Sequence, residues 1–383
     1  MRSPTRRAAL AVCVALLLVT AGCNGGTTPT STAPTTTGTP TTTGTWSPNA
    51  TVEQYPPGVA ANGTLTNASR LVNAHFNATA NKSLELTYKG VYSDQRFVNR
   101  YAHGTNQTPY YSTLNRTHTS DSDHSIRRAG ESYQTGSHGY IKDDGGTKTD
   151  YTVTQDPSSG GSSWLDLAPY TAQRTMWGHL STGNYTVNGT VERDGQTFVQ
   201  LTANGSTPPD KLPSYEGTAL VTPDGVVYNI DASFGPPDNE YDESISLDTD
   251  VKWSGAPPWV ADLPQLSLSV VQDGRALEIR NTGGAALPAN VSFDVYVRNT
   301  TTETVEDSDR STADANGTVI TDARLEPGDA VYVTAEIDGN SSSFTLHDEP
   351  TRGDYTFGFA GLRGTHEHIS YRLVTGVKTS QYE

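Results

Sequence analysis

Apolar residues alternate with polar ones in short runs along much of this chain, and tight-turn residues end many of these runs. The alternation is clearest at 84–88, 291–297 and 331–337, and Pro-Asp-Gly at 223–225 and Asp-Gly at 338–339 are turn signals. Successive side chains of a β-strand point to opposite faces, so alternation indicates a strand with one buried face. Asp-Gly pairs favour the tight turns that join antiparallel strands. The sequence therefore predicts a mainly antiparallel β protein.

Two segments break this alternation and carry the periodicity of a helix. The first is expected at 67–80, where Thr66 or Asn67 can cap the helix and apolar residues recur three or four positions apart. The second is expected near 165–181, with Pro169 close to its first turn, where a missing amide hydrogen is tolerated. We therefore expect one or two helices in addition to the strands.

The folded part of the chain is expected to form two domains. The first domain, 51–256, contains both predicted helices and is α+β. Two prolines open a linker at 257–262, and all elements predicted from 263 to 383 are strands. Short strands at this spacing are typical of a β-sandwich. The segment 279–284 resembles a strand-to-turn phrase of immunoglobulin-like modules, so we expect an all-β immunoglobulin-like sandwich.

The first 22 residues have the features of an export signal. Arg2, Arg6 and Arg7 precede an uncharged apolar run, 8–19, which is shorter than the about 20 residues that a membrane-spanning helix needs. Residues 1–22 are therefore predicted to be a signal peptide. The segment around Arg6 and Arg7 resembles the twin-arginine signal, which implies export of an already folded protein.

Cys23 follows Val-Thr-Ala-Gly, a pattern that resembles the lipobox of prokaryotic lipoproteins. The resemblance implies cleavage before Cys23 and a lipid on its sulfur, which would anchor the protein to the outer face of the cell membrane. An ordinary signal peptide with an incidental cysteine is the alternative. The residues that follow, up to 50, are expected to be a disordered tether, because 12 of the 22 residues from 24 to 45 are Thr.

Acidic residues outnumber basic ones, with 42 Asp and Glu against 26 Lys and Arg. The net charge of −16 argues against nucleic acid as a partner, because nucleic acid is bound by basic surfaces. The Asp-rich, Lys-poor and Thr-rich composition resembles that of haloarchaeal proteins, in which concentrated salt screens the repulsion between carboxylates. We therefore expect a halophilic archaeal protein, and an acidic surface protein from a mesophile is the alternative.

Asparagines followed at the second position by Ser or Thr are more frequent than this composition would give by chance, and 14 of the 20 asparagines have this pattern. Each such sequon permits N-glycosylation of an exported protein where the side chain is exposed. The excess predicts a glycoprotein, although Asn and Thr are also common turn and strand residues. The candidate positions are Asn49, Asn62, Asn67, Asn77, Asn81, Asn106, Asn115, Asn184, Asn188, Asn204, Asn290, Asn299, Asn316 and Asn340.

Two phrases of the first domain resemble a family of uncharacterised haloarchaeal lipoproteins. They are Tyr-Pro-Pro-Gly-Val at 55–59, followed by the helix around 71–75, and Val-Lys-Trp at 251–253, followed by Pro-Trp at 258–259. The element order is also similar to the LolA/LppX-like fold. That resemblance implies a curled antiparallel sheet with helices on its concave side, and a groove for apolar lipid chains. A filled core without a groove is the alternative.

No spacing in the sequence identifies a catalytic or metal site. His366 and His368 could share a metal from one strand face, and His118 and His124 enclose two aspartates in what reads as a solvated loop. If Cys23 carries a lipid, no free thiol remains once the signal peptide is removed. We therefore expect no catalytic residue, no metal and no cofactor, in a protein that is not an enzyme.

Three functions remain open at this point. The first is a non-catalytic cell-surface lipoprotein whose first domain binds an apolar ligand or lipid. The second is a structural or adhesive protein of the cell envelope, with an envelope protein as its partner. The third is a secreted hydrolase whose catalytic residues the sequence does not reveal.

Overall fold

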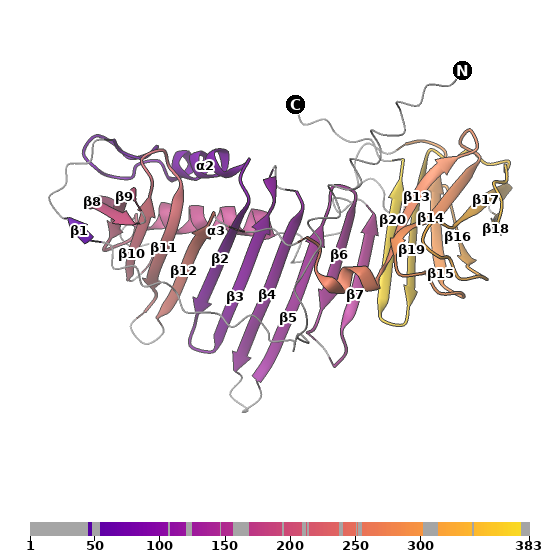
Figure 1. Ribbon diagram of the computed structural model, residues 1–383, viewed down its shortest axis with the longest axis horizontal. Helices are drawn as coiled ribbons and strands as arrows, with labels where there is room; N and C mark the ends of the chain where they lie inside the picture. Colours follow the sequence, from indigo (N-terminus) through magenta and orange to yellow (C-terminus); the bar gives the residue numbers. More distant parts are fainter. Residues whose placement is uncertain are drawn as a thin grey trace, which may run out of the picture. The chain divides into compact units, whose positions relative to one another are not determined.

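The computed structural model of the protein describes residues 45–47, 54–105, 108–119, 125–145, 147–155, 168–193, 195–208, 212, 214–236, 240–249, 251, 255–301, 313–338 and 341–376. Its helices are α2 (Ala68–Thr79), α3 (Ala168–Thr182) and the 3-10 helix η3 (Pro258–Asp262) (Figure 1). The earlier strands are β1 (Thr45–Ser47), β2 (Leu84–Val91), β3 (Gln95–His103), β4 (Tyr110–Thr119), β5 (Ser125–Gln134), β6 (His138–Asp143), β7 (Asp150–Gln155), β8 (Thr186–Arg193), β9 (Gln196–Ala203), β10 (Tyr215–Val221), β11 (Val227–Phe234) and β12 (Tyr241–Asp248). The later strands are β13 (Pro264–Val271), β14 (Ala276–Gly284), β15 (Ser292–Arg298), β16 (Ala315–Ile320), β17 (Ala330–Asp338), β18 (Ser341–His347), β19 (Phe359–His366) and β20 (Ile369–Thr375).

Most of the strands belong to one large mixed sheet. Its order is β1-β8-β9-β10-β11-β12-β2-β3-β4-β5-β6-β7-β20-β19-β15-β16, and the remaining four strands form a second sheet in the order β13-β14-β17-β18. Among the described strand pairs only β7 and β20 are parallel, with Val153 opposite Tyr371. The large sheet therefore continues past the linker predicted at 257–262, since strands from both sides of that linker contribute to it.

Helices α2 and α3 cover one face of the large sheet from β8 to β4. Leu71 of α2 and Met176 of α3 are fully buried and share one apolar cluster with strand residues that include Leu86 and Tyr101. On β2, Leu84 and Leu86 are buried while Glu85 between them is more exposed. This is the alternation expected of an antiparallel sheet with one covered face.

The buried face of the large sheet changes sides between β4 and β5. Leu86 lies opposite Tyr101, which in turn lies opposite Ser112. Ser112 lies opposite Ser132, so all four side chains share the face on which the helices pack. Tyr133, the next residue of β5, points to the other face and belongs to the apolar cluster formed with the four-stranded sheet. In Figure 1, α3 accordingly passes behind the strands, whereas η3 and β13 lie in front.

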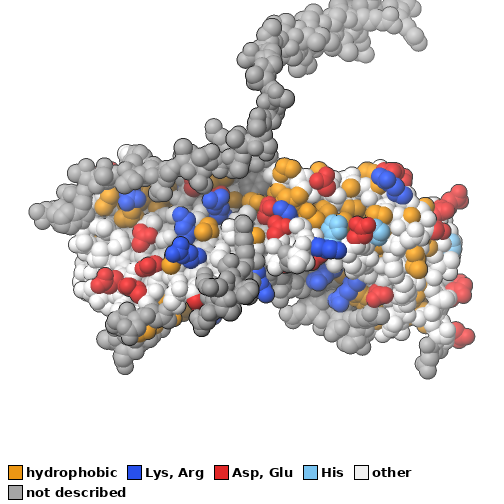
Figure 2. All heavy atoms as spheres, turned by 90° about the horizontal axis from the view of Figure 1, so that it is seen from below, with side chains coloured by type: hydrophobic (Ala, Val, Ile, Leu, Met, Phe, Trp, Pro, Cys, Tyr) orange, Lys and Arg blue, Asp and Glu red, His pale blue; other side chains and the backbone are white. Residues whose placement is uncertain are grey.

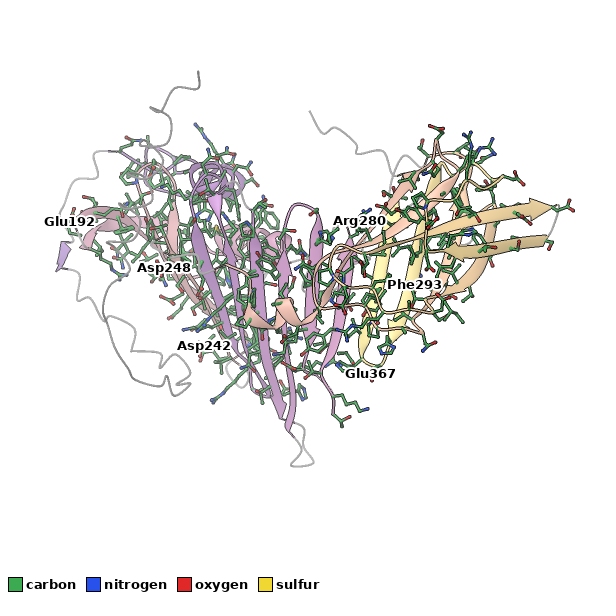
Figure 3. The ribbon with its side chains drawn as sticks, turned by 45° about the vertical axis from the view of Figure 1, so that its right-hand side comes forward. Glu192, Asp242, Asp248, Arg280, Phe293 and Glu367 are labelled. Carbon is green, nitrogen blue, oxygen red and sulfur yellow. The ribbon has the colours of Figure 1, made fainter. Side chains whose placement is uncertain are left out.

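The four-stranded sheet and the last strands of the large sheet form two packed layers. Leu268 and Ile279 of the small sheet are buried against Phe293 and Leu362 of the large sheet. Phe293, labelled in Figure 3, lies between the layers. Two layers with alternating inward residues are the arrangement expected of a sandwich, and here one layer is also part of the large sheet.

The local sequence signals agree closely with the observed elements. Helix α2 is capped by Asn67, whose side chain accepts a hydrogen bond from the backbone N–H of Arg70 at 2.9 Å. The predicted turn at 223–225 joins β10 to β11, with the N–H of Gly225 donating to the carbonyl of Thr222 at 2.9 Å. The described part of the chain is thus mostly β with two α-helices, and none of its helices is long and apolar enough to cross a membrane.

Candidate functional site

A pocket of about 500 Å³ lies between α3 and the helix-covered face of β2, β10, β11 and β12. One part of its lining is aromatic and aliphatic, and consists of Tyr88, Leu212, Tyr215 and Phe234. The other part is polar or charged and consists of Arg174, Thr175, Thr182, His179 and Glu243. An apolar lining with a few polar groups is typical of small-molecule sites.

Helix α3 positions the polar part of this lining. Its buried residues recur every four positions and fix the helix on the sheet: Ala172, Met176 and Leu180. His179 adjoins this stripe and is itself buried, so its ring is held against the sheet. Arg174 lines the pocket one turn earlier and is exposed, which places its guanidinium at the pocket rim.

The most buried hydrogen-bonded pair of titratable side chains at the pocket is His179 with Glu243, called the dyad below. The Nε2 of His179 lies 2.8 Å from Oε2 of Glu243, and the two side chains are 6% and 8% exposed. The hydroxyl of Tyr92 donates to the other carboxylate oxygen. Burial alone would raise the pKa of Glu243, but the hydrogen bonds from His179 and Tyr92 outweigh it and hold the pKa below its ordinary value. Glu243 is therefore ionised at neutral pH.

A second set of hydrogen bonds links the dyad to two buried tyrosines. The hydroxyl of Tyr215 donates to the backbone carbonyl of His179 at 3.2 Å and lies 3.0 Å from the hydroxyl of Tyr185. Burial raises the pKa of Tyr215 to about 12, and burial likewise raises the pKa of Tyr88. These phenols therefore stay protonated and act as neutral hydrogen-bonding groups.

The dyad has the geometry of a carboxylate that orients an imidazole, as in hydrolases. A hydrolase also needs a nucleophile at the second imidazole nitrogen. The hydroxyl found beside Nδ1 of His179 is that of Tyr215, at 3.5 Å. A buried phenol with a raised pKa is a poor nucleophile.

A neighbouring pocket of about 470 Å³ extends the aromatic lining. It is formed by Tyr92, Ser93, Asp94, Phe234 and Tyr241. Phe234 lines both pockets, and its ring centroid lies 5.7 Å from that of Tyr241. Tyr92 and Tyr241 meet edge to face at 4.9 Å. The two pockets thus share the ring of Phe234, which lies at the end of β11 close to the start of β12.

The residues predicted for attachment and export, Cys23, Arg6 and Arg7, lie outside the described residues, as do Asn49, Asn106 and Asn340. The side chains of the other sequon asparagines are all exposed: Asn62, Asn67, Asn77, Asn81, Asn115, Asn184, Asn188, Asn204, Asn290, Asn299 and Asn316. By contrast, Asn281, which is not in a sequon, is fully buried. The exposure that glycosylation needs is therefore present at each described sequon.

The histidine pairs noted in the sequence do not form a metal site in the described part of the chain. His366 and His368 flank Glu367 at the tip of the β19–β20 hairpin (Figure 3). His118 pairs with Asp94 at 2.9 Å, and His124 lies outside the described residues. Within those residues, no group of three or more His, Cys, Asp or Glu side chains could hold a metal ion.

Sequence reasoning did not identify His179 or Glu243, since they are 64 positions apart and belong to no recognisable motif. The Trp177 side chain is 45% exposed, and its indole N–H donates to the hydroxyl of Ser69 on α2 at 3.0 Å. On the face shown in Figure 2, acidic and basic side chains are scattered among uncharged ones without forming one large basic patch among the residues drawn in colour.

Two solved structures align with this chain at low similarity. One is MucB in complex with MucA(peri), with 12% identity, 73% of this chain and 91% of that chain covered, and a TM-score of 0.19. The other is MucB alone, with 15% identity, 74% and 92% covered, and a TM-score of 0.20. No protein-family model and no curated protein matches the sequence. The chain is thus distantly similar to MucB, and the expected haloarchaeal lipoprotein family stays a prediction.

Proposed function

We propose that the protein is a non-catalytic binding protein of the cell exterior whose α3 pocket takes a small amphipathic molecule with an apolar body and an acidic head. One observation carries the proposal: an aromatic pocket opens beside an exposed arginine, Arg174, that has no ion-pair partner among the described residues. The pocket volume of about 500 Å³ lies within the usual range of ligand sites.

The two ends of the pocket would distinguish the two ends of such a ligand. Tyr88, Leu212 and Phe234 offer apolar surface, on which each buried methylene group contributes about 0.8 kcal/mol. Glu243 at the inner side is ionised and would repel an acidic group. Arg174 at the rim can bind a carboxylate or phosphate through two parallel hydrogen bonds. The acidic head would therefore stay at the rim and the apolar body would point inward.

The proposal also includes the location of the protein outside the cell. The predicted signal peptide and the pattern at Cys23 support export and attachment through a lipid, and the composition supports a halophilic archaeal source. The exposure of the described sequons supports glycans on the surface. Residues 45–47 form β1 and pair with β8, so the tether would span about 21 residues, 24–44, and the pocket could meet ligands away from the membrane plane.

Gly178 provides a direct test, because it lines the pocket and a Cβ built there meets no atom within 4 Å. Gly178→Leu would place a side chain in the pocket and at the same time favour the helix by about 0.5–1 kcal/mol. Gln173→Leu adds the same side chain to an exposed position of α3 and serves as the matched control. The full chain would be exported by a haloarchaeal host and kept in salt until native mass spectrometry.

The expected result is an additional mass in the lipid range on the wild-type chain and on Gln173→Leu, lost on mild activation. Gly178→Leu should carry none while keeping its circular dichroism and thermal midpoint. Protein and glycan mass alone on the wild type would contradict the proposal and favour the structural or adhesive function. Equal ligand on all three chains would place the ligand elsewhere in the protein.

A further inference from the structure

The face of β15, β19 and β20 that points away from the four-stranded sheet carries two arginines side by side. Arg363 of β19 lies directly opposite Arg372 of β20, and on its other side it lies opposite Asp294 of β15. Residues paired in this way have Cβ atoms about 4.5–5.5 Å apart, and like charges so placed destabilise a sheet. Both arginine side chains are exposed. The row thus holds one carboxylate and two guanidinium groups, with Arg363 in the middle.

Neither of these arginines has an acidic partner in the described part of the chain, whereas three others in the later strands and loops do. Within the described residues, neither Arg363 nor Arg372 forms an ion pair. By contrast, Arg280, Arg324 and Arg352 each hold a carboxylate, at 2.9, 2.9 and 3.3 Å. In a chain with a net charge of −16, two adjacent arginines without acidic partners mark a local excess of positive charge.

The position of Arg363 is set by packing. Its guanidinium lies 5.6 Å from the centre of the Tyr296 ring, a cation–π contact. The Tyr296 ring in turn lies over Gly361, where a Cβ would come within 2.2 Å of it. Because the Tyr296 ring covers only one face of the guanidinium, the N–H groups at the edge of the guanidinium stay available to an acceptor.

A row of hydroxyl groups borders the arginines. Ser292, Thr365 and Ser370 lie opposite one another on the same three strands, two residues along from the charged row. The two rows line a shallow pocket of about 380 Å³. Guanidinium groups supply charged donors and hydroxyl groups supply neutral ones, so the pocket presents donors from two sides.

We propose that this pocket binds an oxyanion, a sulfate, phosphate or carboxylate group, held between Arg363 and Arg372 and bordered by the hydroxyl row. Such a group would relieve the repulsion between the two guanidinium groups and accept hydrogen bonds from both. Asp294 lines the pocket at its β15 end, where its carboxylate would repel an anion, so the anion lies at the β20 end. The site is separate from the α3 pocket, which uses other strands.

Arginine footprinting tests the proposal on the full chain. Phenylglyoxal modifies free guanidinium groups, and peptide mass spectrometry reports each arginine separately. Modification of Arg363 and Arg372 should slow about tenfold at a sulfate concentration ten times the Kd, by mass action, and should saturate. Arg324 and Arg352 are internal controls. Sodium chloride at equal ionic strength replaces sulfate in the reference sample.

Two variants sharpen this test. In Arg363→Gln the protection of Arg372 by sulfate should be lost, whereas Arg324→Gln should leave it unchanged. Protection that is equal at all arginines, that does not saturate, or that survives in Arg363→Gln would overturn the proposal. Trigalacturonate would identify the source of the anion: protection at lower concentration than sulfate indicates an acidic sugar chain, and protection at similar concentration indicates a free anion.

Discussion

Replacing Glu243 by glutamine removes the charge from the buried dyad while keeping its shape. The carboxylate accepts one hydrogen bond on each oxygen, from His179 and from Tyr92. A glutamine offers a single acceptor oxygen, so its amide nitrogen must face one of the two former donors. The hydroxyl of Tyr92 can rotate and become an acceptor, whereas the imidazole N–H of His179 cannot while it donates from Nε2.

The expected loss of unfolding free energy follows from these contacts. Exchanging charge-assisted hydrogen bonds for neutral ones costs about 1–3 kcal/mol in total. Glu243→Ala would leave His179 and Tyr92 without an acceptor and would cost about 3–5 kcal/mol, because one partner of a buried pair is removed. Glu216→Gln, an exposed position on β10, should change stability by no more than about 0.5 kcal/mol.

The loss should also depend on pH. The pKa of Glu243 is lower in the folded protein than its ordinary value of 4.5. Its stabilising contribution is therefore fully present above pH 4.5 and disappears as the pH falls through the folded-state pKa. The difference between wild type and Glu243→Gln should thus be largest near neutrality and shrink below pH 4.5.

Urea unfolding at constant salt, followed by circular dichroism from pH 3 to pH 7, measures both effects. The slope of free energy against urea should be unchanged among the variants, since the surface exposed on unfolding is the same. Two results would refute the reasoning: a Glu243→Gln protein as stable as wild type at neutral pH, or a stability loss that does not shrink toward acid.

Three further predictions concern other parts of the chain. His75 is buried with its pKa lowered to about 4, and its Nδ1 accepts from the backbone N–H of Val227, so protonation opposes folding. The free energy of unfolding should fall by up to about 3 kcal/mol as the pH drops from 6.5 toward 4. Urea unfolding at several pH values should show that this pH dependence is absent in His75→Gln. Asn67→Ala removes the cap on the N–H of Arg70 and should cost about 1 kcal/mol in the same assay, and an unchanged midpoint would show that the cap is unimportant. Cys23→Ser should move the protein from the membrane fraction to the medium, and a protein that stays with the membrane is not anchored by this residue.

The sequence predicts the local elements well because their determinants are local. The Asn67 cap and the Leu71 spacing specify α2 within a few residues, and the turn at 223–225 specifies where β10 ends. The change of the buried side between β4 and β5, by contrast, is not determined by neighbouring residues in the sequence. It depends on Ser112 pairing with Ser132 across β4 and β5, and on what packs against Tyr133 from a different region of the chain.

The candidate pocket could not be predicted for the same reason. His179 is one of several helix positions beside an apolar stripe, and Glu243 lies on β12 between the polar residues Asp242, which is exposed, and Ser244, which is half-buried. Only the order of strands, in which β12 lies between β11 and β2, brings Glu243 under α3 and beside Tyr92. The carboxylate looks like a surface residue in the sequence, whereas in the fold it is 8% exposed.

The parallel pairing of β7 with β20 sets an order of assembly. Residues 151–154 can form this ladder only after residues 369–372 have been synthesised, and these lie more than two hundred positions later in the chain. Until then β7 is an open strand edge, which can pair with other chains. Contacts between such distant segments slow folding, because a long loop must close first. A chain interrupted before residue 369 would keep the edge open, so aggregation of nascent chains should begin at β7.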